Sequence, residues 1–199
     1  DPDLIGEALP FSLKLMESVL ASTPEHRGLL AATSAGFTQY AYAFVQQQAD
    51  ATALDDTDRA WTQWNRARRL YLRARDYGLR GLDVAMPGFS AGLRGDAAVA
   101  GARASAAEVD LLYGTAVSWV AAISLGKDDP SLVAELPRVS AMSDRALALD
   151  EAWDRGAIIY ARGNVLRLAP PLCITPQEVD QLIDVVAASI KELDAESGR

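Results

Sequence analysis

RAWTQWNRARRLYLRARDYGLRGL, residues 59–82, is the stretch that decides the fold of this chain. At about 100° per residue, its apolar and small side chains share one side, which holds Trp64, Ala67, Leu70, Tyr71, Ala74, Gly78, Gly81 and Leu82. The opposite side holds Arg66, Arg69, Arg73 and Arg80. This spacing predicts an amphipathic helix of about six turns.

Arg68 and Arg75 do not fit this division of the helix. They lie seven residues apart at the edge of the apolar side, next to Trp61 and Leu79. An unpaired guanidinium buried at such an edge is costly, so each arginine needs a carboxylate, an aromatic ring or a ligand. Two interpretations stay open: a structural salt bridge or cation–π contact, and a pair of arginines that binds a ligand.

The second interpretation defines a candidate ligand-binding site. We expect Arg68 and Arg75 to face a concave surface or pore lined by aromatic side chains. The aromatic candidates are Tyr71 in the same helix, and Tyr113 and Trp119 further along the chain. Because a guanidinium both pairs with carboxylates and stacks on aromatic rings, this set suits an apolar ligand that carries a negative charge.

Composition argues against several partners and sites. The formal net charge of −8 disfavours nucleic acid and anionic membrane surfaces as partners. One cysteine, Cys173, excludes an internal disulfide, and one histidine, His26, leaves no material for a histidine-rich metal site or a catalytic triad. We therefore expect no metal and no cofactor. No apolar run reaches the length of about eighteen residues that a membrane span needs.

The remaining segments predict an all-α fold. Apolar residues recur at helical spacing in most of the chain, in residues 5–21, 25–48, 106–126 and 139–153. Three of the helix ends share a pattern of a small or β-branched residue, a leucine and a breaker about five residues later. This pattern favours stacked antiparallel helix pairs of the tetratricopeptide (TPR) kind over a four-helix bundle.

Turn and cap residues set the expected boundaries. Pro24 is expected in the first turn of the second helix, with His26 exposed beside it. Residues 49–57 read as an acidic loop, and Met86-Pro87-Gly88 is expected to stop the arginine-rich helix. Asp128 and Asp129 are expected to cap the helix that Pro130 opens.

Five longer motifs, spread over residues 8–157, carry a family resemblance. They are ALPFSLKLMES, GFTQYAYAFV, RARRLYLRARDYGLRGLD followed by PGF, LLYGTAVSWVAAISLGKDD and RALALDEAWDRGAI. Together they resemble the TatT family, the TPR-like components associated with periplasmic TRAP transporters. Two positions depart from the family pattern: Gly114 stands where a Trp is usual, and Ile159-Tyr160 stand where a His-Glu pair is usual.

The resemblance implies a function as well as a fold. A TatT-like protein is an all-helical exported protein, often a lipoprotein, and is not an enzyme. It would bind a periplasmic solute-binding protein and a small apolar or carboxylated ligand. Because the chain begins at Asp1 rather than Met, we expect that an N-terminal segment, which could have carried a lipid anchor, was removed.

The tail has a different resemblance. Residues 161–193, ARGNVLRLAPPLCITPQEVDQLIDVVAASIKEL, resemble the carboxyl-terminal end of class III pyridoxal-phosphate aminotransferases. An aminotransferase-related fragment or fusion is therefore the alternative to a binding component. It would lack a complete active site, because none of the three lysines stands in a cofactor-binding setting.

The same tail sets the expected domain division. We expect a helical domain over residues 1–158 and an appendage over residues 159–199. The appendage would hold a strand-like run, Asn164–Leu168, and an amphipathic helix over residues 176–193 with Thr175 as its N-cap. The apolar face of that helix needs a surface to cover it, either the last helix pair or another subunit of a homo-oligomer.

Overall fold

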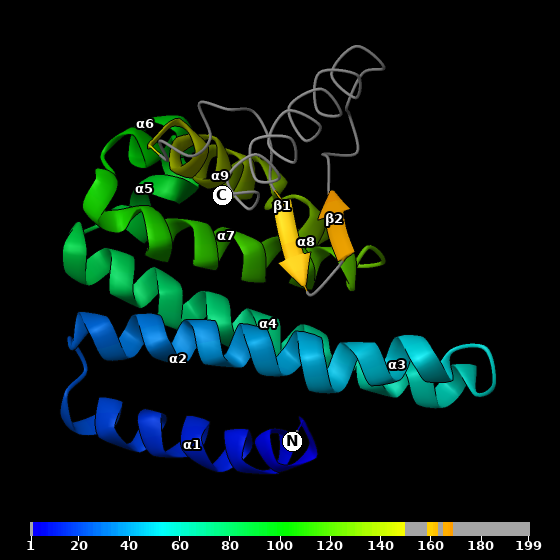
Figure 1. Ribbon diagram of the computed structural model, residues 1–199. Helices are drawn as coiled ribbons and strands as arrows, with labels where there is room; N and C mark the ends of the chain where they lie inside the picture. Colours follow the sequence, from blue (N-terminus) through cyan, green and yellow to red (C-terminus); the bar gives the residue numbers. More distant parts are fainter. Residues whose placement is uncertain (1, 150–158, 163–164, 169–199) are drawn as a thin grey trace, which may run out of the picture. The chain divides into compact units, whose positions relative to one another are not determined.

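The computed structural model describes residues 2–149, 159–162 and 165–168 (Figure 1). The first of these ranges is almost wholly helical, with α1 (Pro2–Ser22), α2 (Arg27–Tyr40), the π-helical turn η1 (Ala41–Gln46), α3 (Gln47–Thr52), α4 (Thr57–Ala85), α5 (Phe89–Gly95), α6 (Ala97–Ala102), the 3-10 turn η2 (Ala106–Glu108), α7 (Val109–Ser124), α8 (Pro130–Val133) and α9 (Leu136–Leu149). The predicted all-α class is confirmed.

The chain divides into two compact units, Asp1–Leu149 and Asp150–Arg199. In the second unit, the described residues form a two-stranded antiparallel sheet of β1 (Ile159–Arg162) and β2 (Val165–Leu168). The expected strand-like run therefore corresponds to β2, whereas its partner β1 was not expected. The helix expected over 176–193 lies outside the described residues, and the predicted domain boundary at 158 stays a prediction.

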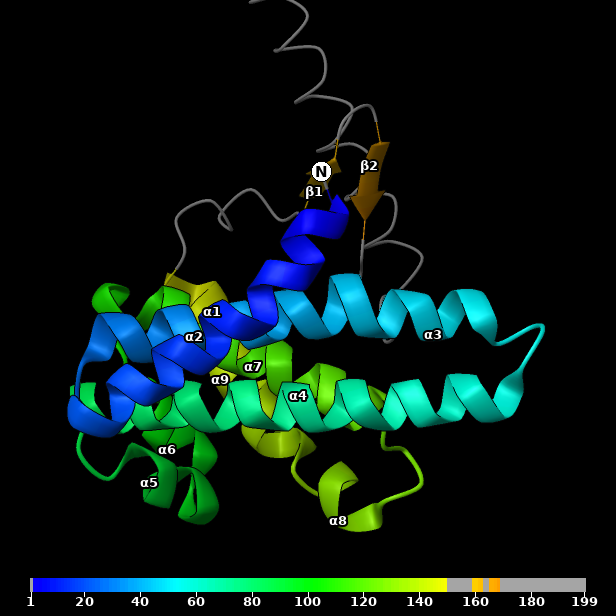
Figure 2. The same ribbon diagram turned by 90° about the horizontal axis from the view of Figure 1, so that it is seen from below.

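The long helices of the first unit stack in chain order. α1 packs on α2, α2 on α4, α4 on α7 and α7 on α9. The direction of the chain reverses from each of these helices to the next, and Figure 2 shows the same neighbours from below. This order agrees with the expected antiparallel pairs, and a specific kinship to TPR repeats stays a prediction.

The arginine-rich helix α4 lies at the centre of this stack and has well-defined ends. Asp56 caps its start, because one carboxylate oxygen accepts a hydrogen bond from the Arg59 N–H at 2.9 Å. The helix ends at Ala85 with Met86 as its C-cap, and Gly88 follows with φ of +76°, a left-handed conformation that side chains disfavour. The expected stop at Met86-Pro87-Gly88 is confirmed.

Small residues let three helices meet closely at the middle of α4. A Cβ atom at Gly78 would lie 2.1 Å from Thr115 Oγ1 of α7 and 3.1 Å from Ser34 Oγ of α2. The Ser34 hydroxyl donates to the Ala74 carbonyl at 2.8 Å, so this buried crossing is also hydrogen-bonded. Glycine is required here because the backbone of α4 approaches its two neighbours without room for a side chain.

The second helix differs from its expected form in two ways. It begins at Arg27 rather than Glu25, because His26 acts as the N-cap and its Nδ1 accepts from the Leu29 N–H at 3.1 Å. Pro24 lies in the preceding turn, and His26 is exposed as expected but is the N-cap rather than a residue of the first turn. The helix also widens into η1 and continues into α3, which shortens the expected loop at residues 49–57 to about the segment 53–56.

Later boundaries follow the proline and aspartate signals more closely. Asp129 caps α8 as expected, accepting from the Ser131 N–H at 3.0 Å and the Leu132 N–H at 3.3 Å. Helix α9 begins at Leu136, with Pro137 in its first turn, rather than at Val139. Residues 150–153, which were expected to complete that helix, lie outside the described part of the chain.

Candidate functional site

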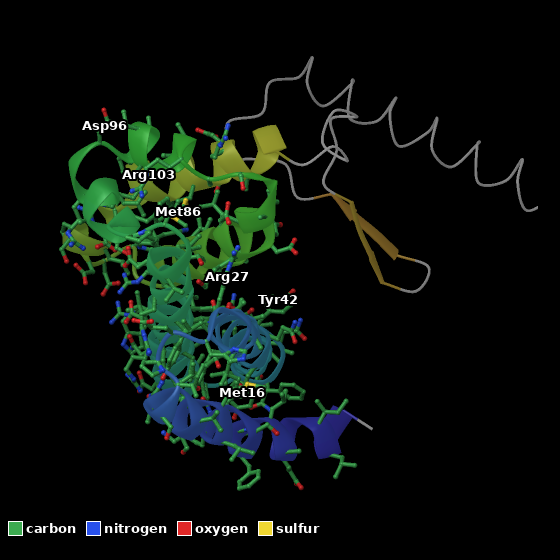
Figure 3. The ribbon with its side chains drawn as sticks, turned by 90° about the vertical axis from the view of Figure 1, so that its left-hand side faces the viewer. Met16, Arg27, Tyr42, Met86, Asp96 and Arg103 are labelled. Carbon is green, nitrogen blue, oxygen red and sulfur yellow. The ribbon has the colours of Figure 1, made fainter. Side chains whose placement is uncertain are left out.

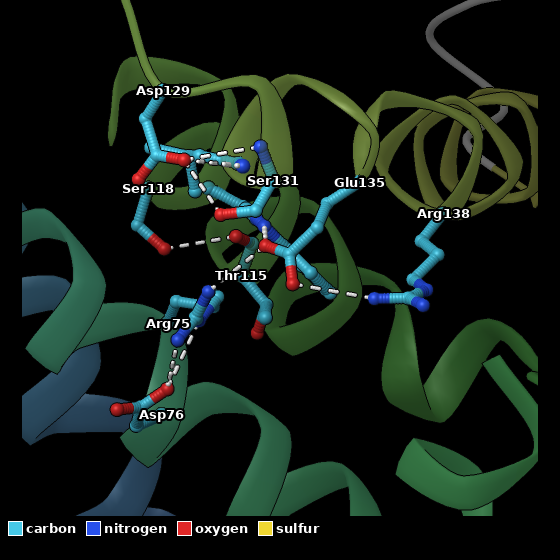
Figure 4. A network of polar contacts seen from close by, with 10 residues as sticks. Arg75, Asp76, Thr115, Ser118, Asp129, Ser131, Glu135 and Arg138 are labelled. Carbon is cyan, nitrogen blue, oxygen red and sulfur yellow. Dashed lines mark hydrogen bonds and ion pairs between the residues drawn. The ribbon is translucent and has the colours of Figure 1, made fainter. Parts of the chain in front are cut away.

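Arg75 stands at the centre of a polar network between α4, α7 and the segment that precedes α9 (Figure 4). Its Nη1 donates to Glu135 Oε2 at 3.2 Å, its Nε donates to Asp76 Oδ1 at 2.9 Å, and its Nη2 lies 2.8 Å from the same Asp76 atom. The guanidinium carbon also lies 5.1 Å from the centre of the Trp119 ring. All three nitrogens of Arg75 and one face of its guanidinium are therefore engaged within the protein.

Glu135 is the carboxylate that closes this network. Its Oε2 accepts a second hydrogen bond, from Trp119 Nε1 at 2.8 Å, and its Oε1 accepts from Arg138 Nη1 at 3.2 Å. One carboxylate thus connects α4, α7 and α9. Charge-assisted hydrogen bonds of this kind are the stronger ones, so the network fixes the segment before α9 against the body of the stack.

Arg68 reaches the other end of the same connection. Its Nη1 lies 3.8 Å from Asp128 Oδ1, which is too long for a hydrogen bond. Its side chain lies over Gly126, where an added Cβ would be 3.0 Å from Arg68 Cδ. The two arginines therefore hold the α7–α9 connection on both sides of α8, Arg75 tightly and Arg68 loosely.

One of the two tyrosines of the predicted site, Tyr71, lies away from the arginines. The Tyr71 hydroxyl donates to Gln46 Oε1 of η1 at 2.7 Å, so this ring lies against the second helix. Burial, with smaller contributions from Tyr42 and Asp50, raises the pKa of Tyr71 above its usual range and keeps the phenol protonated. Tyr113 packs at the margin of the core cluster that contains Trp119. The structure brings together Arg68, Arg75 and Trp119 near α8, and Tyr71 belongs to another cluster.

Sequence reasoning missed a second carboxylate network on the other side of α4. Glu17 of α1 accepts a hydrogen bond from Tyr77 at 2.9 Å and from Lys14 at 2.7 Å, and it pairs with Arg73. Burial tends to raise the pKa of Glu17, but the hydrogen bonds from Lys14, Tyr77 and Arg73 lower it below its ordinary value. A carboxylate with three donors is held in its charged form and fixes α1 to α4.

A ladder of arginines on aromatic rings accompanies this network. The guanidinium carbons of Arg66, Arg73 and Arg80 lie 5.9, 5.3 and 5.3 Å from the ring centres of Tyr40, Phe37 and Tyr77. The three arginines are spaced by seven residues, which was visible in the sequence. The sequence pattern assigns these arginines to the polar side of the helix. A helical wheel does not show that a long side chain can turn back from that side onto an aromatic ring.

A surface without charged residues was also missed. The sequence carries no charged residue from Gly28 to Ala49, a range that covers nearly all of α2, η1 and the start of α3. It carries none from Leu111 to Gly126, which covers nearly all of α7. Since α2 contacts α7, these two helices place uncharged surfaces next to one another. The composition of the two segments could have shown this feature.

Within residues 2–149, 159–162 and 165–168, no group of three or more His, Cys, Asp or Glu side chains could hold a metal ion. Among the same residues, no helix is both long enough and apolar enough to cross a membrane.

Comparison with known proteins identifies the family. The chain is similar to an uncharacterized protein of Treponema pallidum (strain Nichols), with 39% identity over 72 residues. That similarity covers 36% of this chain and 22% of the relative, so the chain matches only about a fifth of that protein's length.

The sequence model of one protein family, described as TAtT, TRAP transporter T-component, matches residues 1–171. The match continues past residue 161 into the stretch that resembled aminotransferases, so that second resemblance is not borne out and the alternative function has no support. The match covers well over half of the chain. The chain belongs to the family of TRAP transporter T-components.

Proposed function

We propose that this protein is a non-enzymatic, periplasmic T-component that binds the solute-binding protein of a TRAP transporter through the uncharged surface of α2 and α7. Membership of the T-component family supports a role in transport. The observation that carries the specific proposal is the uncharged surface, because nothing in the architecture of a helix stack requires two of its neighbouring helices to lack charge.

The exposed side chains of this surface are small, apolar or uncharged polar. They include Ala32, Ala35, Gln39 and Tyr42 on α2 and η1, and Val120 and Ser124 on α7. Figure 3 shows Tyr42 on the outer side of its helix, away from α4. The centre of a protein interface is depleted of charged residues and enriched in tyrosine, whereas an ordinary solvent-facing helix side is rich in charges. In a chain of net charge −8, an uncharged side on two neighbouring helices is what a protein partner would require.

We assign the arginine pair two different parts in this function. Arg75, with its nitrogens engaged by Glu135 and Asp76, serves to hold the α7–α9 connection in place. Among the described residues, Arg68 has only the longer ion pair with Asp128, so its guanidinium is the one that a carboxylated, apolar ligand would pair with. Trp119 would then support the ligand site through Arg75. Tyr71 would contribute to it only through the packing of α4, whereas Tyr113 packs at the margin of the cluster that contains Trp119.

The proposed location is the periplasm, where a solute-binding protein of a TRAP transporter would meet its partner. A lipid anchor on a segment preceding residue 1 would hold the protein at the membrane. This part of the proposal rests on the family. Globomycin treatment of the native host, followed by fractionation, tests it: an anchored precursor accumulates, and a protein that fractionates unchanged contradicts the anchor.

Charge placed on the uncharged surface tests the proposed docking. We expect Ala35→Glu and Val120→Glu to weaken binding of the cognate solute-binding protein, measured by titration calorimetry, by at least about tenfold, because a carboxylate would be desolvated without a partner. Both positions border solvent, so the melting temperature should stay within about a degree of wild type. Val99→Glu in α6, which is also exposed, is the matched control. Equal binding by all four proteins would contradict the proposal.

A further inference from the structure

The exposed side of α4 carries an arginine row made of Arg59, Arg66, Arg73 and Arg80. Its members follow one another at intervals of seven residues, so they lie about 10.5 Å apart along the helix and nearly in line. All four are exposed. Over its whole length α4 holds seven arginines and only three aspartates, although the chain has a net charge of −8. The arginine row is therefore a local concentration of positive charge on an acidic protein.

The second half of the arginine row shows which groups these arginines bind. Arg73 pairs with the Glu17 carboxylate of α1, and Arg80 Nη2 donates to the Pro24 carbonyl at 3.2 Å. Glu17 and Pro24 are themselves seven residues apart. Helix α1 and the turn after it thus match two successive arginines with two acceptors at the same spacing. An acceptor at every seventh residue is what a helix lying alongside α4 can supply.

The first half of the arginine row lacks such acceptors. Seven residues before Glu17, α1 has Pro10, whose side chain offers no acceptor. Within the described part of the chain, no ion pair joins Arg59, Arg66 or the neighbouring Arg69 to a carboxylate. Arg66 and Arg69 are three residues apart, a spacing at which like charges destabilise a helix. A carboxylate from outside the described chain would relieve this repulsion.

Arg66 is held in position although it has no carboxylate. Its guanidinium carbon lies 5.9 Å from the centre of the Tyr40 ring, and its Nη2 donates to the Tyr40 hydroxyl at 3.1 Å. Tyr40 is buried and stacks on Phe44, so its ring is a fixed support. Arg73 stands over Phe37 in the same way and still binds a carboxylate. A ring contacts one face of a guanidinium, whereas a carboxylate binds along its edge, so one arginine can bind both.

We propose that Arg59 and Arg66 bind an acidic helix of a partner protein, one that presents carboxylates seven residues apart. The contact repeats the one between Arg73 and Glu17, with the carboxylate supplied from outside the chain. Neither Arg59 nor Arg66 belongs to the uncharged surface of α2 and α7. The acidic partner is therefore bound independently of the docking proposed for the solute-binding protein.

A broad anionic surface fits the arginine row less well than a helix does. Three exposed aspartates, Asp55, Asp56 and Asp58, stand directly before Arg59, and the exposed Asp76 lies further along the helix. A lipid bilayer or a nucleic acid presents negative charge over its whole surface and would meet these aspartates as well. A single helix covers a narrow strip, so its carboxylates can face the arginines alone.

Binding of a helical peptide by the full chain tests the spacing. The probe is an alanine-rich peptide of about twenty residues with a glutamate at every seventh position, followed by fluorescence anisotropy at low salt. We expect a dissociation constant on the order of 100 micromolar that rises as salt is added. A peptide of the same composition, with its glutamates about five residues apart and so on different sides of its helix, should bind at least about threefold more weakly. Equal binding of the two peptides would overturn the proposal.

Substitutions test whether the arginine row is the site. Arg59→Gln and Arg66→Gln should each weaken binding of the first peptide by at least about threefold, and the double variant by about tenfold. Arg94→Gln, which removes an exposed arginine of α5, is the matched control and should leave binding unchanged. Among the described residues the Arg59 side chain has no hydrogen bond or ion pair, so Arg59→Gln should fold normally, as circular dichroism will check.

Two results would contradict the acidic helix as the partner. One is an equal loss of peptide binding in Arg94→Gln, because the attraction would then follow net charge alone. The other is binding of phosphatidylglycerol vesicles or of inorganic phosphate that the double variant abolishes, in a protein that does not bind the peptide. The arginine row would then be a site for lipid or for free anions.

Discussion

The two sides of α4 carry two carboxylate networks that resemble each other and differ in burial. On one side, Glu17 of α1 accepts from Lys14, Arg73 and Tyr77, and its side chain is 8% exposed. On the other side, Glu135 accepts from Arg75, Trp119 and Arg138, and its side chain is 25% exposed. Each network joins an arginine of α4 to a neighbouring helix through one shared carboxylate.

A helical wheel predicts the surroundings of Arg75 but not those of Arg73. Arg75 lies at the apolar edge of α4, and its need for a partner was predicted from that position. Arg73 lies on the polar side, yet its guanidinium reaches a nearly buried carboxylate and the ring of Phe37. A wheel records the direction of the Cβ atom, whereas an arginine side chain is long enough to turn back over its neighbours.

Removal of each shared carboxylate should have the largest effect on stability, and the effect should differ between the two networks. We expect Glu17→Ala to lower the free energy of unfolding by about 2–3 kcal/mol and Glu135→Ala by about 1–2 kcal/mol, because the better desolvated carboxylate makes stronger charge-assisted bonds. Urea unfolding followed by circular dichroism measures both. Equal losses, or a larger loss for Glu135→Ala, would mean that burial does not set the difference.

The arginine pair offers a smaller and sharper comparison. Arg75→Met keeps the aliphatic stem and removes the bonds to Glu135 and Asp76, so we expect a loss of about 1–2 kcal/mol. Arg68→Met removes only the long ion pair with Asp128, whose partner is largely exposed, and should cost less than about 0.5 kcal/mol. Binding of an apolar carboxylate such as a fatty acid, measured on the same variants, should fall for Arg68→Met. If Arg75→Met instead melts like wild type and loses binding, Arg75 is the ligand residue.

Acid should weaken the Glu17 network, with the smallest effect of the three. Burial raises the pKa of Glu17 in the folded protein. The hydrogen bonds from Lys14, Tyr77 and Arg73 lower it by more, so the pKa lies below 4.5. Its contribution to stability is therefore complete above about pH 4.5 and is lost as the pH falls through the lowered pKa. The difference in melting temperature between wild type and Glu17→Gln should shrink over that range. A difference that is constant from pH 6 to about pH 3 would contradict the assignment.

Much of the fold was predictable because its signals are local. Helical spacing located the main helices, Met86-Pro87-Gly88 ended α4, and Asp129 capped α8. The widening of the second helix at η1 was not predictable from helical spacing, and Gln46 at its end accepts a hydrogen bond from Tyr71 of α4, a contact between residues far apart in the chain. Strand β1 was missed for a similar reason: it becomes a strand only by pairing with β2.

The candidate site shows the same limit. The sequence identified Arg75 and Trp119 as members of one group, and the structure places them 5.1 Å apart. It could not identify Glu135 as their common partner, because that carboxylate lies sixty positions from Arg75 in the chain and reaches it only through the turn around α8. It also grouped Tyr71 with them, although the ring of Tyr71 lies against η1.

By itself, the sequence determined the all-α class, the position of the central amphipathic helix and the family, because periodicity, caps and long motifs are written in consecutive residues. The tertiary structure alone decided which partner each arginine of α4 holds and which sides of α1, α2 and α7 stay exposed. Those outcomes depend on how helices stack, and a helix's own sequence does not state which neighbour will cover each of its sides.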